Sequence, residues 1–153
     1  IEPCDTEKVW EMFRRNHYLS GKINKSANSW VACVKGKPVA MTSVTPFTSG
    51  IWSDGWRGQR TVVLPEFQGI GIGSSLSDFV ASEVIRTGAR FFSKTAHPAL
   101  GEHRNKSISW KPTSKNMVKR KDYNSSRKTK EDGHKAAHAH RICYSHEYIG
   151  NNS

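Results

Sequence analysis

The segment that decides the fold is residues 61–76, TVVLPEFQGIGIGSSL. It starts as an apolar run, passes through glycines at alternate positions, and ends where apolar residues take up helical spacing. Glycine lets consecutive backbone N–H groups turn toward one point, and the N-terminus of a following helix adds about half a positive charge there. The segment therefore predicts a strand, a turn and a helix whose junction binds a phosphate or pyrophosphate.

Other glycine-rich phosphate sites fit this segment poorly. A dinucleotide fingerprint needs GxGxxG, with an acidic residue about 20 positions further on, and a P-loop needs GK followed by Ser or Thr. Here the pattern is GxGxGS, and no Lys follows the glycines. A glycine turn without a ligand is disfavoured because a strand, the glycines and a long helix coincide.

Upstream of this segment the sequence predicts one helix and a hairpin. Apolar residues at helical spacing predict a helix from about residue 6 to 16. Residues 30–34 and 38–44 read as two strands joined by a tight turn that contains glycine. Residues 45–59 show no period and are expected to form an irregular loop, which leads into a strand at 59–64.

Downstream, helices and strands alternate. Apolar residues at helical spacing, followed by Gly88, predict a helix over 74–87. A strand is expected at 89–96, a short helix at 98–107 and an extended segment at 108–112. Residues 141–149 alternate in polarity and predict a closing strand. The fold class is therefore α/β, in one domain over residues 1–153.

The chain is strongly basic. Its 153 residues hold 24 Lys and Arg against 13 Asp and Glu, so the formal charge is 24 − 13 = +11, which excludes an acidic or neutral carrier. The densest part is an insertion at about 113–137, before the last strand, which is either a solvated, mobile loop or a polyanion contact. The candidate nucleic-acid contacts within it are Lys119, Arg120, Lys121, Arg127 and Lys128.

Cysteine usage and hydropathy point to the cytoplasm. Three cysteines without CxxC spacing fit reduced thiols better than a disulfide framework. No apolar run reaches the roughly 18 to 20 residues of a membrane span, and no signal peptide is evident, so no membrane partner is expected. The chain begins at Ile1 rather than Met, which leaves room for an upstream segment.

Residues 68–73, QGIGIG, match the Q/R-x-x-G-x-G/A signature of the GNAT family of N-acetyltransferases, and the chain resembles that family over most of residues 6 to 112. The resemblance implies a mixed, strongly bent sheet, flanked by helices, whose fourth and fifth strands splay apart to admit acetyl-CoA or another acyl-CoA. The implied cofactor-binding residues are Val62, Val63, Gln68, Gly69, Ile70, Gly71, Ile72, Gly73 and Ser74, with Arg104 as a further phosphate contact.

A narrower resemblance is carried mainly by His17-Tyr18-Leu19 after the first helix. It is similar to acetyltransferase-like domains of phage and mobile-element proteins and to Mom-type proteins that modify adenine in DNA. This resemblance implies DNA as a possible partner and a phage-encoded protein acting in the host cytoplasm.

Acyl transfer to an amine needs a base, oxyanion donors and an acid for the leaving thiolate. Many relatives use a Tyr on the helix after the fifth strand as that acid, and no Tyr lies between His97 and Ser107. The candidates are His17 as base, with Tyr18, Ser93 or Tyr144 in place of the missing Tyr. His17 could equally be a loop histidine bonded to backbone, and Tyr18 could be core.

Two further groups of residues allow alternative readings. Three tryptophans, at 52, 56 and 110, could stack on an exposed base or belong to the core. Histidines at 134, 138, 140 and 146 resemble strand-borne metal ligands but lack a Cys or carboxylate at ligand spacing, so no metal is expected.

The sequence predicts an N-acyltransferase acting on an amine acceptor, with a Mom-like DNA-modifying enzyme and a non-catalytic nucleic-acid-binding module as alternatives.

Overall fold

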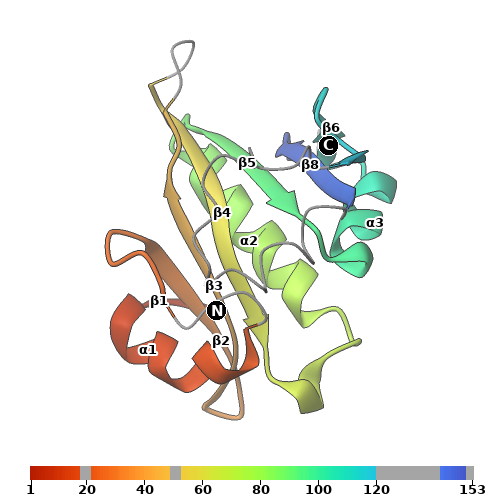
Figure 1. Cartoon of the computed structure of the whole chain (residues 1–153). Coiled ribbons are helices and arrows are strands. Elements are labelled where there is room, and N and C mark those ends of the chain that lie inside the picture. The colour runs from red at the N-terminus through yellow and green to blue at the C-terminus, as the bar shows by residue number, and fades with distance from the viewer. Residues whose placement is uncertain (18–21, 49–52, 120–141, 151–153) are drawn as a thin grey trace, which may run out of the picture.

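A computed structural model describes residues 1–17, 22–48, 53–119 and 142–150 of the chain. Within these residues one twisted sheet runs in the order β1-β2-β3-β4-β5-β8-β6, and β7 pairs with β8 (Figure 1). Every pairing is antiparallel except that of β4 with β5. The strands are β1 (Glu2–Cys4), β2 (Asn28–Val34), β3 (Lys37–Pro46), β4 (Gly55–Val63), β5 (Arg90–Thr95), β6 (Trp110–Pro112), β7 (Val118–Lys119) and β8 (Ile142–Tyr148).

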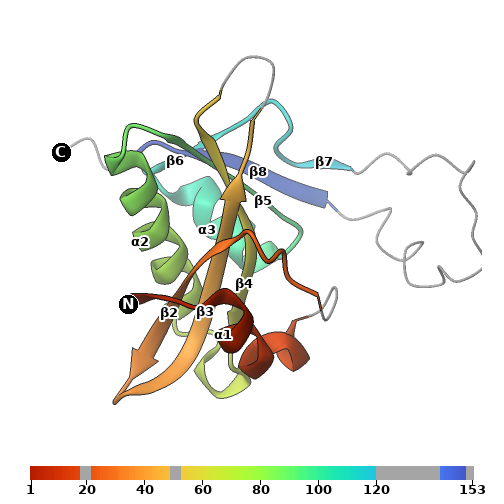
Figure 2. The same ribbon diagram turned by 90° about the vertical axis from the view of Figure 1, so that its left-hand side faces the viewer.

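Helices pack on both faces of the sheet. Figure 2 shows α2 (Ile72–Arg86) on one side of β3 and α1 (Thr6–Phe13) on the other. The α1 helix continues as a 3₁₀ turn to Asn16. The third helix, α3 (Pro98–Lys106), lies beside α2 and contacts β5, β6 and β8.

Alternation along β3 separates two cores. Met41 points toward α1, whereas Ala40 and Val44 point toward α2, because successive side chains in a strand face opposite sides. The smaller core, under α1, contains Trp10, Phe13, Val31, Met41 and Val62. The larger core, under α2, contains Ala40, Val44, Leu76, Val80, Ala81, Val84, Phe91, Trp110 and Tyr148. Both clusters are buried, so the central strands are covered on both faces.

The α/β class, the mixed sheet and its flanking helices are confirmed. The expectation of a loop over residues 45–59 was partly wrong, because β4 begins at Gly55 and the β3–β4 ladder extends to the pair Pro46–Trp56. The edge strand β1 was not predicted, since three residues give too little periodicity. Of the basic insertion, residues 113–119 are described and include β7, while 120–141 lie outside the described residues.

Candidate functional site

The strands β4 and β5 pair only at their starts. The parallel ladder joins Gly55 to Arg90, Trp56 to Phe91 and Arg57 to Phe92, and it ends there. Beyond it β4 keeps its partner β3, and β5 keeps its partner β8, so the two strands diverge toward their C-terminal ends (Figure 1). Among the described residues, the β5-facing edge of β4 from residue 58 to 63 therefore has no strand partner.

Gly58 and Ser93 lie where the two strands separate. A Cβ added to Gly58 would lie 3.5 Å from Ser93 Oγ and 3.7 Å from Phe91 Cζ, both ordinary contact distances, so Gly58 faces these two side chains across the separation. Ser93 is buried, with 7% of its surface exposed. The candidate catalytic hydroxyl thus lies at the narrow end of the separation. Sequence reasoning missed Gly58, although an isolated glycine within a strand was the available signal.

The glycine turn follows β4 at the wide end of the separation. Gly69 and Gly71 have positive φ angles of 81° and 88°, and Gly71 is the N-cap of α2. Ser75 N donates to the Gly71 carbonyl, but the amides of residues 69–74 donate no hydrogen bond to any described part of the chain. Such exposed, unpaired N–H groups at a helix N-terminus form an anion site.

One hydrogen bond fixes this turn to the end of β4, and a second closes the first turn of α2. Gln68 Nε2 donates to the Val63 carbonyl oxygen at 2.9 Å, and Ser74 Oγ donates to the Gly71 carbonyl oxygen at 2.9 Å. At Gly73 an added Cβ would come within 3.1 Å of Val63 Cγ2, a tight contact, so the first turn of α2 packs closely against the end of the strand. The unpaired amides and the unpaired strand edge therefore meet at Val63.

His17 lies on the other face of the sheet, at the end of the 3₁₀ turn. Its ring contacts Trp10 with 5.6 Å between centroids, and its amide donates to the Arg14 carbonyl. Burial, and then the nearby Arg60 cation, lower the pKa of His17 from 6.5 to about 4. The imidazole is consequently neutral at pH 7 and accepts a proton only weakly. Tyr18, which follows it, lies outside the described residues.

We expect the depressed pKa of His17 to make folding sensitive to acid. The unfolded chain binds a proton on His17 near pH 6.5 and the folded chain only near pH 4, so its contribution to stability is complete above pH 6.5 and is lost as the pH falls through 4. Thermal melts at pH 7 and pH 4 should show a smaller fall of Tm for His17→Asn than for the unsubstituted protein. Equal falls of Tm in His17→Asn and in the unsubstituted protein would contradict the lowered pKa of His17.

Tyr144 packs against α3. Its hydroxyl donates to Glu102 Oε1 at 3.0 Å, and this hydrogen bond, followed by burial, raises the pKa of the phenol. The ring lies directly on Gly101, where a Cβ would overlap it. Tyr144 pairs in register with Thr95 on β5, two residues beyond Ser93. A protonated phenol is thus held beside the strand that carries Ser93.

Arg104 lies inside the protein rather than on the surface of α3. It is 2% exposed, its Nη2 donates to Ser77 Oγ at 2.9 Å, and its guanidinium stacks 4.4 Å from the centre of the Trp110 ring. Its Nε and Nη1 have no hydrogen-bond partner among the described residues. Burial lowers the pKa of Arg104 to about 10, while Asp78 opposes that shift. In this position Arg104 joins α3 to α2.

The structure describes only part of the expected nucleic-acid contacts. Lys119 is exposed on β7, while Arg120, Lys121, Arg127 and Lys128 lie outside the described residues. Trp110 belongs to the buried core and Trp56 packs against it, which settles the reading of these two in favour of the core. Of the histidines considered for a metal, His146 is buried and its Nε2 lies 2.8 Å from Asn105 Oδ1.

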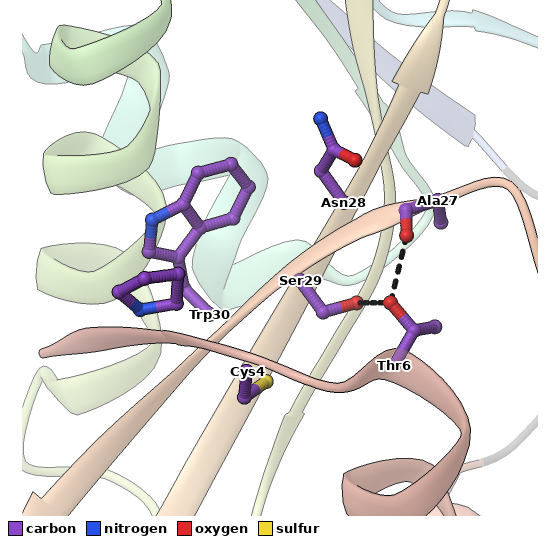
Figure 3. Close-up of a pocket in the computed structure, with 7 residues that line it drawn as sticks. Cys4, Thr6, Ala27, Asn28, Ser29 and Trp30 are labelled. Atoms are coloured by element: carbon purple, nitrogen blue, oxygen red, sulfur yellow. Dashed lines mark hydrogen bonds between the residues drawn. The ribbon is translucent and has the colours of Figure 1, made fainter.

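Two shallow pockets lie near the N-terminal elements. One, of about 270 Å³, is lined by residues of β1, the start of α1 and β2 (Figure 3). Thr6 Oγ1 lies 2.7 Å from the Ala27 carbonyl oxygen and 2.8 Å from Ser29 Oγ, so these groups satisfy one another. The other, of about 310 Å³, lies between α1 and residues 22–25, where Lys25 Nζ is 2.7 Å from Glu7 Oε1. Neither includes the glycine turn.

Comparison with known families identifies the class of protein. The model of the acetyltransferase (GNAT) family matches residues 2–104, and this chain belongs to that family. No curated protein matches the chain. Within the described residues, no helix has both the length and the apolar character that a membrane crossing requires.

Solved structures of the family share the fold at low sequence identity. The ribosomal-protein-S18-alanine N-acetyltransferase of Escherichia coli has a TM-score of 0.63 and 13% identity, over 99% of this chain and 95% of that one. A ribosomal-protein-alanine N-acetyltransferase from Brucella melitensis has a TM-score of 0.56 and 16% identity, over 80% and 68%.

A streptothricin acetyltransferase described as putative, from Bacillus anthracis and in complex with acetyl coenzyme A, has a TM-score of 0.54 and 7% identity, over 86% and 66%. Two other structures are matched over less than half of their length, 44% and 39%.

Proposed function

We propose that this protein is an N-acyltransferase that transfers the acyl group of acetyl-CoA, or of another acyl-CoA, to an amine. One observation carries the proposal: the unpaired amides of residues 69–74 and the unpaired edge of β4 meet at Val63. A diphosphate on the amides would continue into a pantetheine arm along that edge. Membership of the acetyltransferase (GNAT) family supports this reading.

The bound thioester would supply an activated carbonyl carbon and a thiolate leaving group. The chain's part is to orient it and to move protons. A backbone N–H at Val62 or Val63 would donate to the carbonyl oxygen and stabilise the charge that develops there. As the amine nitrogen bonds to the carbonyl carbon and the C–S bond breaks, one proton leaves the nitrogen and one reaches the sulfur.

We assign the proton removal to His17 and the proton donation to Ser93 or Tyr18, with Tyr144 as a further candidate. His17 is neutral at pH 7 and so can accept a proton, though its low pKa makes it a weak base. Ser93 is supported by its place at the narrow end of the β4–β5 separation. Tyr144 is supported by its protonated phenol on the neighbouring strand β8.

A nucleic-acid amine is the acceptor that the charge favours. A chain at +11 attracts polyanions, which supports DNA over small neutral amines. Two alternatives keep this partner: a Mom-like enzyme that modifies adenine in DNA by altered donor chemistry, and a module that binds nucleic acid without catalysis. Binding of acetyl-CoA distinguishes the acyltransferase from the non-catalytic module. A modified base after incubation with DNA identifies the Mom-like enzyme.

Calorimetry with acetyl-CoA tests the cofactor assignment, and a thiol-release assay tests turnover. We expect one binding site per chain, and CoA release that depends on an added amine, supplied in parallel as a polyamine, a peptide N-terminus and single-stranded DNA. Absence of acetyl-CoA binding would refute the acyltransferase assignment. Binding without release in any arm would instead favour a module that has lost catalysis.

We expect Ser93→Ala to lower kcat by about 100-fold, the lower range for loss of a general acid or base, and to leave KM for acetyl-CoA unchanged. Ser29→Ala is the matched control, because Ser29 is also buried, with 3% of its surface exposed against 7% for Ser93, but lies on β2. Unchanged kcat in Ser93→Ala together with a loss in Tyr144→Phe would move the proton-donating role to the tyrosine.

A further inference from the structure

A row of side chains crosses four strands on the face of the sheet opposite α2. Register places Arg57 of β4 beside Phe92 of β5, Phe92 beside Glu147 of β8, and Glu147 beside Lys111 of β6. The residue next to each of them in sequence either belongs to the core under α2, as do Phe91, Tyr148 and Trp110, or packs against it, as does Trp56. Alternation therefore puts the whole row on the other face.

The described helices leave this part of the face uncovered. Helices α2 and α3 pack on the opposite face, and the main contacts of α1 are with β2 and β3. Arg57 and Lys111 are exposed, and so is Lys94, which lies on β5 two residues beyond Phe92 and on the same face. The surface formed by Arg57, Arg90, Phe92, Lys94, Lys111 and Glu147 is called the basic sheet face below.

The basic sheet face has a net positive charge. It carries four cations and one carboxylate, and that carboxylate is occupied: Arg90 Nε and Nη2 donate to the two oxygens of Glu147 at 2.7 and 2.8 Å. A further acid, Asp54, lies just before β4 and also acts on Arg90. Arg57, Lys94 and Lys111 form none of the ion pairs found among the described residues. They are available to an anionic partner.

Cation–π contacts lie among these cations. The Arg57 guanidinium lies 4.9 Å from the centre of the Phe47 ring, and that of Arg90 lies 5.0 Å from the centre of the Phe92 ring. The two phenyl rings contact each other edge to face at 5.7 Å. A guanidinium that contacts a ring on one side can present its other side to a nucleobase, as in single-stranded RNA recognition. An acidic peptide would use the charges but not these cation–π contacts.

We propose that the basic sheet face binds a single-stranded nucleic acid, with phosphates on Arg57, Lys94 and Lys111 and a base stacked on the Arg57–Phe47 pair. The face includes the last rung of the β4–β5 ladder, Arg57–Phe92, so a bound strand passes the point where the two strands separate. This deepens the proposed function, on which it rests for the amine, by naming the class of partner.

Fluorescence anisotropy with a labelled single-stranded DNA of about 20 nucleotides tests the phosphate contacts. Removal of one cation that neutralises a phosphate lowers the salt dependence of single-strand binding by about 0.7 in the slope of log K against log [salt]. The triple variant Arg57→Ala, Lys94→Ala, Lys111→Ala is therefore expected to reduce that slope by about 2 and the affinity by about tenfold or more.

The matched control removes the same charge elsewhere. Lys8→Ala, Lys37→Ala and Arg86→Ala also lower the net charge by three, from positions on α1, at the start of β3 and on α2. We expect the control to keep most of the affinity. An equal loss in both triple variants would show that only net charge matters and would overturn the proposed site, as would competition by polyglutamate as effective as that by unlabelled DNA.

Phe47→Leu tests the stacking directly, and Phe92→Leu tests it through the ring that contacts Phe47. Loss of one stacked base is expected to weaken single-strand binding about five- to tenfold, with little change in the salt slope. Two variants are used because either ring could also be needed for folding, and thermal melts of each variant report that. Unchanged affinity in both, or tighter binding of duplex than of single strand, would overturn the stacked arrangement, and a matching RNA strand shows which sugar is preferred.

Two variants distinguish an error in the proposed nucleic-acid site from an error in the proposed acyltransferase function. Gly71→Glu should remove acetyl-CoA binding and leave strand binding within about twofold, since the glycine turn is not part of the basic sheet face. The triple variant Arg57→Ala, Lys94→Ala, Lys111→Ala should lose strand binding and keep acetyl-CoA binding. If acetyl-CoA binds but the strand does not, this partner is wrong and the acyltransferase assignment stands.

Discussion

Gly71→Glu is expected to weaken acetyl-CoA binding by more than about 100-fold, because like charges brought together at a binding surface cost several kcal/mol. Gly71 is the N-cap of α2, at the centre of the unpaired amides. A carboxylate there would occupy the anion site and repel a diphosphate. Calorimetric titration with acetyl-CoA measures the effect.

Gly71→Asn is the matched control for backbone strain. The φ angle of 88° favours glycine, and a side chain there costs about 1–2 kcal/mol in either variant, somewhat less for Asn. Both variants should therefore show similar, modest decreases in Tm, while Asn retains most of the acetyl-CoA affinity. Equal losses of affinity would show that conformation, rather than charge, controls the site. Full affinity in Gly71→Glu would contradict the placement of the diphosphate.

Gly101→Ala is expected to destabilise the fold by about 3 kcal/mol, at the upper end of typical overpacking costs. An added Cβ would overlap the Tyr144 ring, whose place is also fixed by the hydrogen bond to Glu102. Relief requires α3 to move away from β8, which would also disturb the Asn105–His146 contact one turn further along. Chemical denaturation reports the free energy of unfolding.

Whether Gly101→Ala destabilises or stabilises the fold should depend on Tyr144. In a Tyr144→Ala background, Gly101→Ala should stabilise by up to about 1 kcal/mol, because alanine is the better helix former. Ala99→Gly, at an exposed position of α3, measures that propensity alone and should cost about 1 kcal/mol. Destabilisation by Gly101→Ala that persists without the tyrosine ring would show that another neighbour limits the space.

The strand, turn and helix over residues 61–76 were predictable because their causes are local. Glycine permits the positive φ angles at 69 and 71, and apolar spacing specifies α2. The start of β4 at Gly55 was not predictable, since it depends on pairing with β3 and with β5, which follows α2 in the chain. The burial of Arg104 also escaped prediction, because a cation at the end of a helix is usually solvated, and only the position of Trp110 and Ser77 places it inside.

The amino-acid sequence by itself determined the glycine turn before α2, since φ preference and helix periodicity act over a few neighbouring residues. Only the tertiary structure decided that β4 and β5 part after Arg57 and Phe92, and that Arg57, Phe92, Glu147 and Lys111 form one row. The physical reason is register: a shift of one residue in any ladder would exchange the two faces of that strand and send these charges into the core.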